Sequence, residues 1–270
     1  MNKKDFLENW KIFFNSFKLS SDFLYILFYD LLFYGIIRPL IYLFSYLMSR
    51  KMSAIDPDIL SKLNSLANVT ASQSLQIQQA AQAMNSFFYT LIIGVILMIL
   101  ITLFAFTLTR ALIWNHLLKK KFDIKKYLRF NLLNLVLAVI LAVILYILLK
   151  IRIGITGLFV KISFNFAVVL SGILYLLIFI AIIYFVSLVY INYTKKAEVF
   201  GSLTRVFRLI KTRFQKISIS YLFILLASAV ITLIAMLRWL LPVYLQSYLN
   251  YALVLIFLAW MRIYIVKIIK

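Results

Sequence analysis

Cysteine is absent from this chain of 270 residues, and histidine occurs once, as His116. The chain can therefore form no disulfide and no thiolate metal site, and one histidine cannot build a multi-histidine metal centre. Acidic residues are also scarce, with 8 Asp and Glu against 29 Lys and Arg. Intramembrane hydrolysis or phosphoryl transfer usually needs paired acids, metal ligands or a nucleophile with a base. We therefore expect no enzyme, no catalytic residue and no bound cofactor.

Charged residues make up only 14% of the chain, and apolar residues make up 65%. Soluble domains average about 45–50% apolar and about 25% charged residues, so an ordinary globular protein is excluded. A formal net charge of +21 would suggest nucleic acid binding in a soluble protein. In a membrane protein the same excess predicts basic loops beside anionic lipid, and we expect membrane lipids rather than nucleic acid as partners.

Six segments are long and apolar enough to cross roughly 30 Å of hydrocarbon, which takes about 20 residues. They span about residues 23–48, 87–113, 131–149, 166–192, 218–240 and 243–267. The sequence therefore predicts an all-α, polytopic integral membrane protein. Its single membrane domain, residues 1–270, would contain six transmembrane helices as three hairpins.

The basic residues alternate along the chain. The N-terminal tail, the second and fourth connections and the C-terminal end hold 21 of the 29 Lys and Arg, whereas the other three connections hold 7. Loops rich in Lys and Arg stay in the cytoplasm, so both termini are predicted to be cytoplasmic in a multi-pass protein of the cell membrane. Trp114, Trp239 and Trp260 fall near span ends, where an interfacial aromatic belt would place them.

Three cytoplasmic segments, residues 1–22, 114–130 and 193–217, share a pattern of lysines followed by apolar residues that lead into a span. In the third, apolar residues recur at intervals of three and four with basic residues between them, which is typical of a basic amphipathic helix in the interface. A threefold repeat would explain the pattern, and positive-inside bias alone would produce similar basic loops. We expect anionic head groups to contact Lys120, Lys121, Lys125, Lys126, Lys195, Lys196, Arg205, Arg208, Lys211 and Arg213.

This layout resembles uncharacterised six-span membrane proteins of bacteria and archaea, including the membrane domain found beside some glycerophosphodiester phosphodiesterases. The resemblance covers most of the chain and rests on layout and hydropathy. The phosphodiesterase catalytic domain has no counterpart here, so the resemblance implies neither an activity nor a site.

Residues 49–86 form the one long polar connection. Asp56 and Pro57 predict a helix start, and a weak heptad-like stripe continues to Met84. We expect a long extracytoplasmic helix, continuous with the second span. It would pack on its own protein or, through residues 57–86, on a second copy or a partner protein. Asn68-Val69-Thr70 matches a glycosylation sequon on this side.

Asp30 and Arg38 are charged residues within the first predicted span, where a charge indicates function by default. One interpretation is a polar cavity around Asp30, Tyr34 and Arg38 that accepts an ion, an anionic head group or a peptide. Pro39 would assist it, because Pro39 cannot donate to the Gly35 carbonyl. The alternative is structural: Asp30 bonds to Arg110 or Arg129, and Arg38 snorkels or fills a satisfied position.

The strongest features are the basic segments, the outer helix and the aromatic-rich bundle. They favour a non-enzymatic membrane scaffold, assembly or lipid-interacting protein. The alternative function is a transporter or channel that uses the polar cavity. With 6 Gly and 3 Pro in the chain, we expect mostly continuous helices, and broken helices are what many transporters use to bind ions.

The orientation can be tested with single cysteines, since the native chain has none. A cysteine introduced beside Lys3 or Lys267 should be protected from a membrane-impermeant maleimide in intact cells. A cysteine in place of Ser53 should react. Labelling of either terminal position in intact cells would refute the predicted topology.

Overall fold

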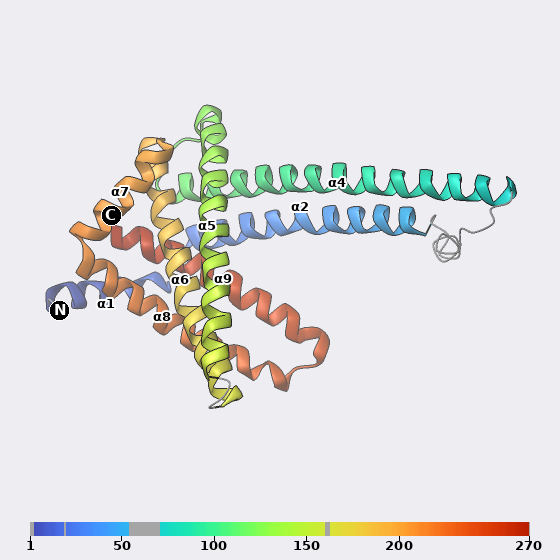
Figure 1. Cartoon of the computed structure of the whole chain (residues 1–270). Helices are drawn as coiled ribbons and strands as arrows, with labels where there is room; N and C mark the ends of the chain where they lie inside the picture. The colour runs from blue at the N-terminus through green and yellow to red at the C-terminus, as the bar shows by residue number, and fades with distance from the viewer. Residues whose placement is uncertain (1–2, 19, 54–70, 160–162, 270) are drawn as a thin grey trace. The chain divides into compact units, whose positions relative to one another are not determined.

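The computed structural model describes residues 3–18, 20–53, 71–159 and 163–269. Over these residues the chain forms eight α-helices and one short 3-10 helix and contains no strand. Along the chain these are α1 (Lys3–Ser16), α2 (Ser21–Met52), α4 (Ala71–Leu117), α5 (Ile124–Phe159), α6 (Phe164–Lys196), α7 (Val199–Thr212), α8 (Phe214–Met236), η2 (Leu237–Leu240) and α9 (Val243–Ile269) (Figure 1).

Six of the helices in this described part are long and apolar enough to cross a membrane, and each coincides with one of the predicted spans. The fifth, α8, ends at Met236, four residues before the predicted end of its span, where η2 begins. The all-α polytopic fold is therefore confirmed, and the protein is a multi-pass membrane protein. A helix satisfies its backbone hydrogen bonds internally, which hydrocarbon requires. Even Pro39 lies inside an unbroken α2.

The chain divides into two compact units. The first contains residues 1–30 and 107–270, and the second contains residues 31–106.

The core of the first unit gathers where the predicted cytoplasmic ends of its helices meet. Fully buried side chains come from the end of α4 (Trp114), the start of α5 (Phe130), the end of α6 (Leu188), the first half of α8 (Ile224) and the end of α9 (Tyr264). Toward their other ends the same helices expose large apolar side chains, among them Val139, Tyr146, Val169, Leu233 and Tyr251. Protein contacts therefore dominate at one end, and the other end is left for lipid.

Two short helices complete this core. α1 lies against α8 and α9, and α7 lies against α5, α6 and α8. On α1, the ring of Phe13 packs at 5.0 Å from Phe223 and edge-on to Trp260 at 5.5 Å. The Trp260 indole N–H donates to Ser16 Oγ at 2.7 Å, which ties α9 to the end of α1.

The aromatic belt prediction is wrong for two of its tryptophans. Trp114 and Trp260 are 1% and 3% exposed, so they belong to the protein core and not to a lipid-facing belt. Both lie at the helix ends where the first unit is most tightly packed. The side chain of Trp239 lies outside the described side chains.

The three basic segments differ from one another in structure. The first and third contain separate short helices, α1 and α7. In the second, residues 118–123 form a link without regular structure and α5 begins at Ile124. The threefold pattern is thus imperfect, because Lys125 and Lys126 already lie in the first turn of a long helix.

In the second unit, the remainder of α2 faces α4 through side chains at intervals of three and four. These half-buried residues are Phe33, Ile37, Leu40, Phe44 and Met48. Phe33 packs edge-on to Phe106 at 5.7 Å. Lys51 Nζ donates to Ser86 Oγ at 2.9 Å near the opposite end of the pair. A side chain at Gly94 would meet the Phe44 ring, so the glycine allows this close approach.

The helix predicted for this connection is confirmed over its described part, since residues 71–86 continue without a break into the second span as α4. Its extracytoplasmic side stays a prediction. The 47 residues of α4 extend about 70 Å at 1.5 Å per residue. That is well beyond a hydrocarbon core of roughly 30 Å. The predicted helix start at Asp56 and Pro57 and the sequon at Asn68 lie outside the described residues.

The docking of α1 can be tested at two neighbouring phenylalanines. Phe13 is 5% exposed and Phe14 is 53% exposed. Phe13→Ala should lower the free energy of unfolding by about 3–5 kcal/mol, because it leaves a cavity between α1, α8 and α9. Phe14→Ala should change it by roughly 0.5 kcal/mol or less. Denaturation in detergent measures both, and equal losses would refute the docking.

Candidate functional site: a buried carboxylate between two arginines

Asp30 is the most deeply buried charged residue on α2, with 1% of its side chain exposed. Its two carboxylate oxygens have different partners. Arg110 Nη1, from α4, donates to Oδ1 at 2.5 Å, and Arg262 Nη1, from α9, donates to Oδ2 at 2.6 Å. Arg110 lies 80 positions after Asp30 in the sequence, and Arg262 lies 232 positions after it. All three residues belong to the first unit.

Uncharged polar groups extend this cluster. Asn134, on α5, donates through Nδ2 to Thr107 Oγ1 at 2.9 Å. Its Oδ1 accepts from the Tyr190 hydroxyl, on α6, at 2.6 Å. Thr107 lies about one turn before Arg110 on α4, so the two groups of contacts share that helix. Four long helices and the start of α2 are therefore joined by polar contacts at one level of the first unit.

Aromatic rings pack against the tyrosine of this cluster. Tyr190 packs edge-on to Phe130 at 5.0 Å and lies 6.1 Å from Trp114, and both neighbours are buried. Apolar walls lower the local dielectric, which strengthens the ion pairs and raises the cost of leaving any of these charges unpaired. The arrangement holds helices together, because both oxygens of Asp30 accept from guanidinium groups and almost none of its surface is exposed.

This geometry bears on the two sequence interpretations of Asp30. Arg110, one of the two partners considered in the structural interpretation, does bond to it. Arg262 was missed. In the sequence, Arg262 is a basic residue near the C-terminal end of a predicted span. Positive-inside bias also places basic residues there, so nothing singled it out.

Tyr34 and Arg38 belong to the second unit, and both are exposed. They lie on α2 with Asp30, four and eight residues further along. The polar cavity predicted from these three residues stays a prediction.

His116 has a partner that sequence reasoning also missed. The nearest carboxylate in the sequence is Asp123, but His116 Nε2 lies 2.9 Å from Asp22 Oδ1, at the start of α2. The ring of Tyr25 stacks on the imidazole with centroids 3.7 Å apart. This second α2–α4 contact is half-exposed, so it lies in a more polar setting than Asp30.

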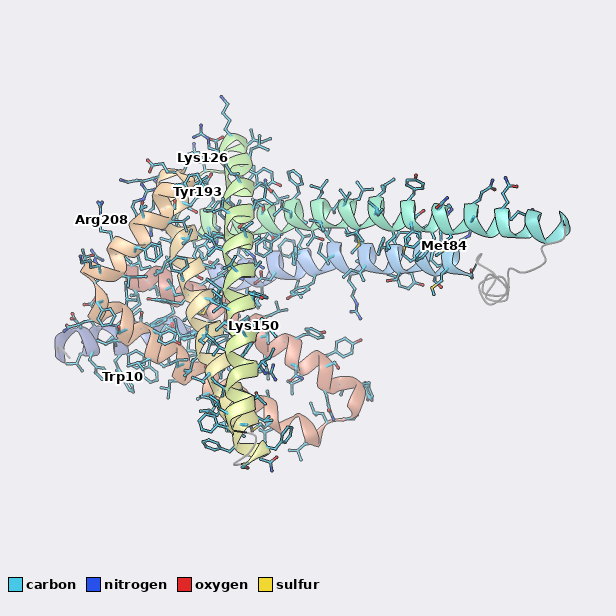
Figure 2. All side chains as sticks on the ribbon, viewed as in Figure 1. Trp10, Met84, Lys126, Lys150, Tyr193 and Arg208 are labelled. Carbon is cyan, nitrogen blue, oxygen red and sulfur yellow. The ribbon has the colours of Figure 1, made fainter. Side chains whose placement is uncertain are left out.

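The predicted head-group contacts lie on three neighbouring stretches of the first unit. Lys120 and Lys121 are exposed in the link before α5, Lys125 and Lys126 are exposed in its first turn, and Lys195 and Lys196 are exposed at the end of α6. The hydroxyl of Tyr193 donates to the Lys126 carbonyl at 2.6 Å, which fixes the end of α6 against the start of α5 (Figure 2).

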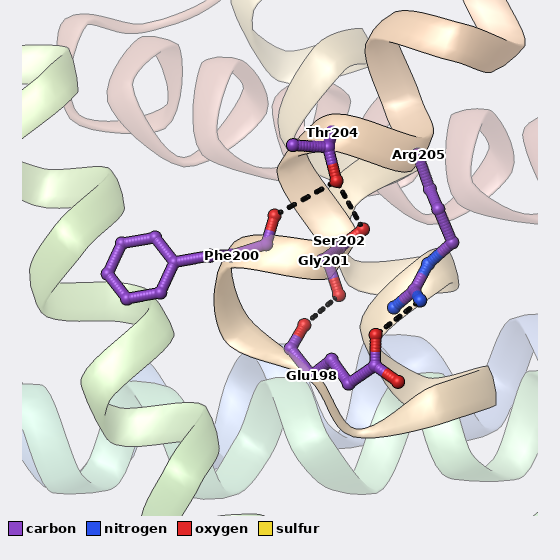
Figure 3. A network of polar contacts seen from close by, with 6 residues as sticks. All are labelled: Glu198, Phe200, Gly201, Ser202, Thr204 and Arg205. Atoms are coloured by element: carbon purple, nitrogen blue, oxygen red, sulfur yellow. Dashed lines mark hydrogen bonds and ion pairs between the residues drawn. The ribbon is translucent and has the colours of Figure 1, made fainter.

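On α7 the basic residues differ in their surroundings. Arg205 Nη1 bonds to Glu198 Oε2 at 2.5 Å, two turns back along the helix (Figure 3). Ser202 donates to the Glu198 carbonyl, and Thr204 Oγ1 donates to the Gly201 carbonyl at 3.1 Å. Arg208, Lys211 and Arg213 are exposed.

No group of three or more His, Cys, Asp or Glu side chains that could hold a metal ion occurs among the described residues. No family model, curated protein or solved structure matches the chain. The geometry described above is therefore the basis for any functional conclusion.

The buried cluster predicts a large difference between two aspartates of α2. Asp30→Asn leaves two buried guanidinium groups together and should lower the free energy of unfolding by about 3–5 kcal/mol. Asp22→Asn, at a half-exposed pair, should cost about 1 kcal/mol or less. Denaturation of the purified protein in detergent measures both.

Adding Arg262→Gln to Asp30→Asn should recover part of the loss, because it removes one of the two facing cations. If Asp30→Asn costs no more than Asp22→Asn, the cluster does not hold the helices together.

Proposed function

We propose that this protein is a non-enzymatic membrane scaffold that organises lipid, and proteins associated with it, at the cytoplasmic leaflet. The basic segments 114–130 and 193–217 would form the contact surface. The observation that supports this most directly is the distribution of side chains around α7. One face packs on the protein, a neighbouring flank would face lipid, and the remaining side would face water.

The side of α7 that packs against the rest of the first unit consists of small and aliphatic residues. Ser202 and Val206 are buried, and Val199, Leu203 and Ile210 are partly buried. This face fixes how the helix lies, because α5, α6 and α8 all contact α7.

A flank of α7 beside the packed face is aromatic. Phe200 and Phe207, seven residues apart, are 67% and 63% exposed, and Phe214 at the start of α8 is 64% exposed. Exposed phenylalanines in a row are costly in water and favourable in the acyl region of a bilayer. We take this flank to enter the membrane.

Basic side chains lie next to the aromatic flank. Arg208 directly follows Phe207, and Lys211 lies four residues after Phe207. Arg208 projects outward from α7 (Figure 2). On a helix, these positions lie on the side of the flank away from the packed face. Long basic side chains there can reach lipid phosphates while the phenylalanines contact acyl chains.

The lysines of the link and of the α6 end add to the same surface. Lys126 lies in an ion-pair geometry with Asp123 at 3.9 Å, and both side chains are about half exposed. Such a surface pair contributes little, so most of the positive charge remains available to an anionic leaflet.

The transporter alternative requires ions or substrates to reach Asp30. Its carboxylate is buried and accepts from two guanidinium groups. This supports a structural role for Asp30 and makes the scaffold the better supported function.

Lipid preference tests the proposal in the full-length protein. The protein would be reconstituted with a dye on Thr204→Cys, and energy transfer to head-group-labelled phosphatidylglycerol or phosphatidylcholine would be compared. Enrichment of the anionic lipid should fall severalfold in Arg208→Gln/Lys211→Gln, since each basic residue near an anionic surface contributes on the order of 1 kcal/mol. It should also weaken with salt.

The matched control is Lys150→Gln/Arg152→Gln, which removes two exposed charges near the other end of α5. It should leave the enrichment around α7 unchanged. Equal transfer to the two lipids in the unaltered protein, or insensitivity to salt, would contradict the proposed surface.

A further inference from the structure

The side of α2 that turns away from α4 in the second unit carries polar side chains along a membrane span. The tyrosine–arginine face consists of the exposed residues Tyr34, Arg38, Tyr42, Ser45 and Ser49. At 3.6 residues per turn these positions fall within about 80° of one another, and their centre lies about 120° from that of the residues facing α4.

Arg38 lies near the middle of its span. Asp22 and Arg50 are the nearest charged residues toward the two ends of α2 apart from the buried Asp30. At 1.5 Å per residue, Arg38 is about 24 Å from the level of Asp22 and about 18 Å from the level of Arg50. Both distances exceed the length of an arginine side chain, so snorkelling alone does not bring the guanidinium to a phosphate layer.

An exposed guanidinium at this depth is costly in hydrocarbon, and such residues usually face protein or a water-filled cavity and pair with another ionisable group or with backbone carbonyls. Polar groups beside it lower the cost of a protein contact here. Tyr34 and Tyr42 lie about one turn before and after Arg38, and Pro39 leaves the Gly35 carbonyl without its helical donor. A side chain at Gly35 would meet nothing within 4 Å, so a neighbouring backbone can approach closely.

The chain itself offers no suitable anion. Of its 8 acidic residues, Asp30 is the one inside a predicted span. Asp30 is buried and bonded to two arginines. The same holds for a second copy of this chain, so neither can supply a free carboxylate at the depth of Arg38.

We infer that the tyrosine–arginine face is a docking site for a transmembrane helix of a different protein, and that this helix carries an Asp or Glu near the middle of the bilayer. The carboxylate pairs with Arg38, and Tyr34 and Tyr42 flank it as hydrogen-bond donors. This inference is independent of the proposed lipid surface, which uses α7 and the basic segments of the first unit.

The test uses a defined probe. Full-length protein with a donor dye on Ser53→Cys is reconstituted in phosphatidylcholine vesicles with an acceptor-labelled polyleucine transmembrane peptide. The peptide has Asp, Asn or Leu at its central position. Energy transfer should show roughly tenfold tighter association with the Asp peptide than with the Leu peptide, as interhelical polar contacts in bilayers allow.

Variants of the protein assign the effect to Arg38. Arg38→Gln should remove the preference for Asp, and Arg38→Lys should keep part of it because the charge remains. Arg50→Gln, on the same helix near its end, is the control and should keep the full preference. Since Arg38 is exposed, Arg38→Gln should melt at the same temperature as the unaltered protein. If Arg38→Gln melts at a different temperature, Arg38→Lys and Tyr42→Phe replace it as the variants that are compared with the unaltered protein.

Three results would overturn the inference. Equal association of the Asp and Leu peptides would remove the docking site, and a preference that survives Arg38→Gln would place it elsewhere. Self-association of donor- and acceptor-labelled copies that depends on Arg38, without any preference for the Asp peptide, would assign the face to a second copy.

Discussion

The carboxylate of Asp30 determines how three helices of the first unit meet. It bonds to Arg110 and to Arg262, each through a different oxygen. A buried carboxylate without partners would be very costly, and so would either guanidinium. The start of α2, the end of α4 and the end of α9 therefore approach one another at one place. The tyrosine–asparagine–threonine contacts add α5 and α6 to the same level.

Four arginines of this protein have three different surroundings. Arg110 and Arg262 are buried against a carboxylate, Arg208 is exposed beside phenylalanines on a short helix, and Arg38 is exposed on a long span. The first setting supports folding, and the second supports contact with an anionic leaflet. The third supports binding to a partner within the bilayer. Local burial and depth, more than residue type, distinguish these roles.

The spans and the amphipathic character of α7 were predictable from the sequence, because both depend on local hydropathy and on apolar spacing. Contacts between distant segments were not. Arg262 was missed because its partner is 232 residues away, and Asp22 was overlooked as the partner of His116 because Asp123 is closer in sequence. Trp114 and Trp260 have sequence positions typical of an interfacial belt. Their burial depends on tertiary contacts, of Trp260 with Phe13 on α1 and of Trp114 with Tyr190 on α6.

The core of the first unit lies toward one end of its long helices, and their other halves present apolar side chains such as Val139, Val169 and Leu233. Those halves depend on acyl chains for most of their lateral contacts. A thinner or more disordered bilayer would alter their spacing while the polar level around Asp30 stays intact. The tertiary structure of this unit therefore depends on lipid composition, and it does so more in the lipid-facing halves of the helices than in the packed core.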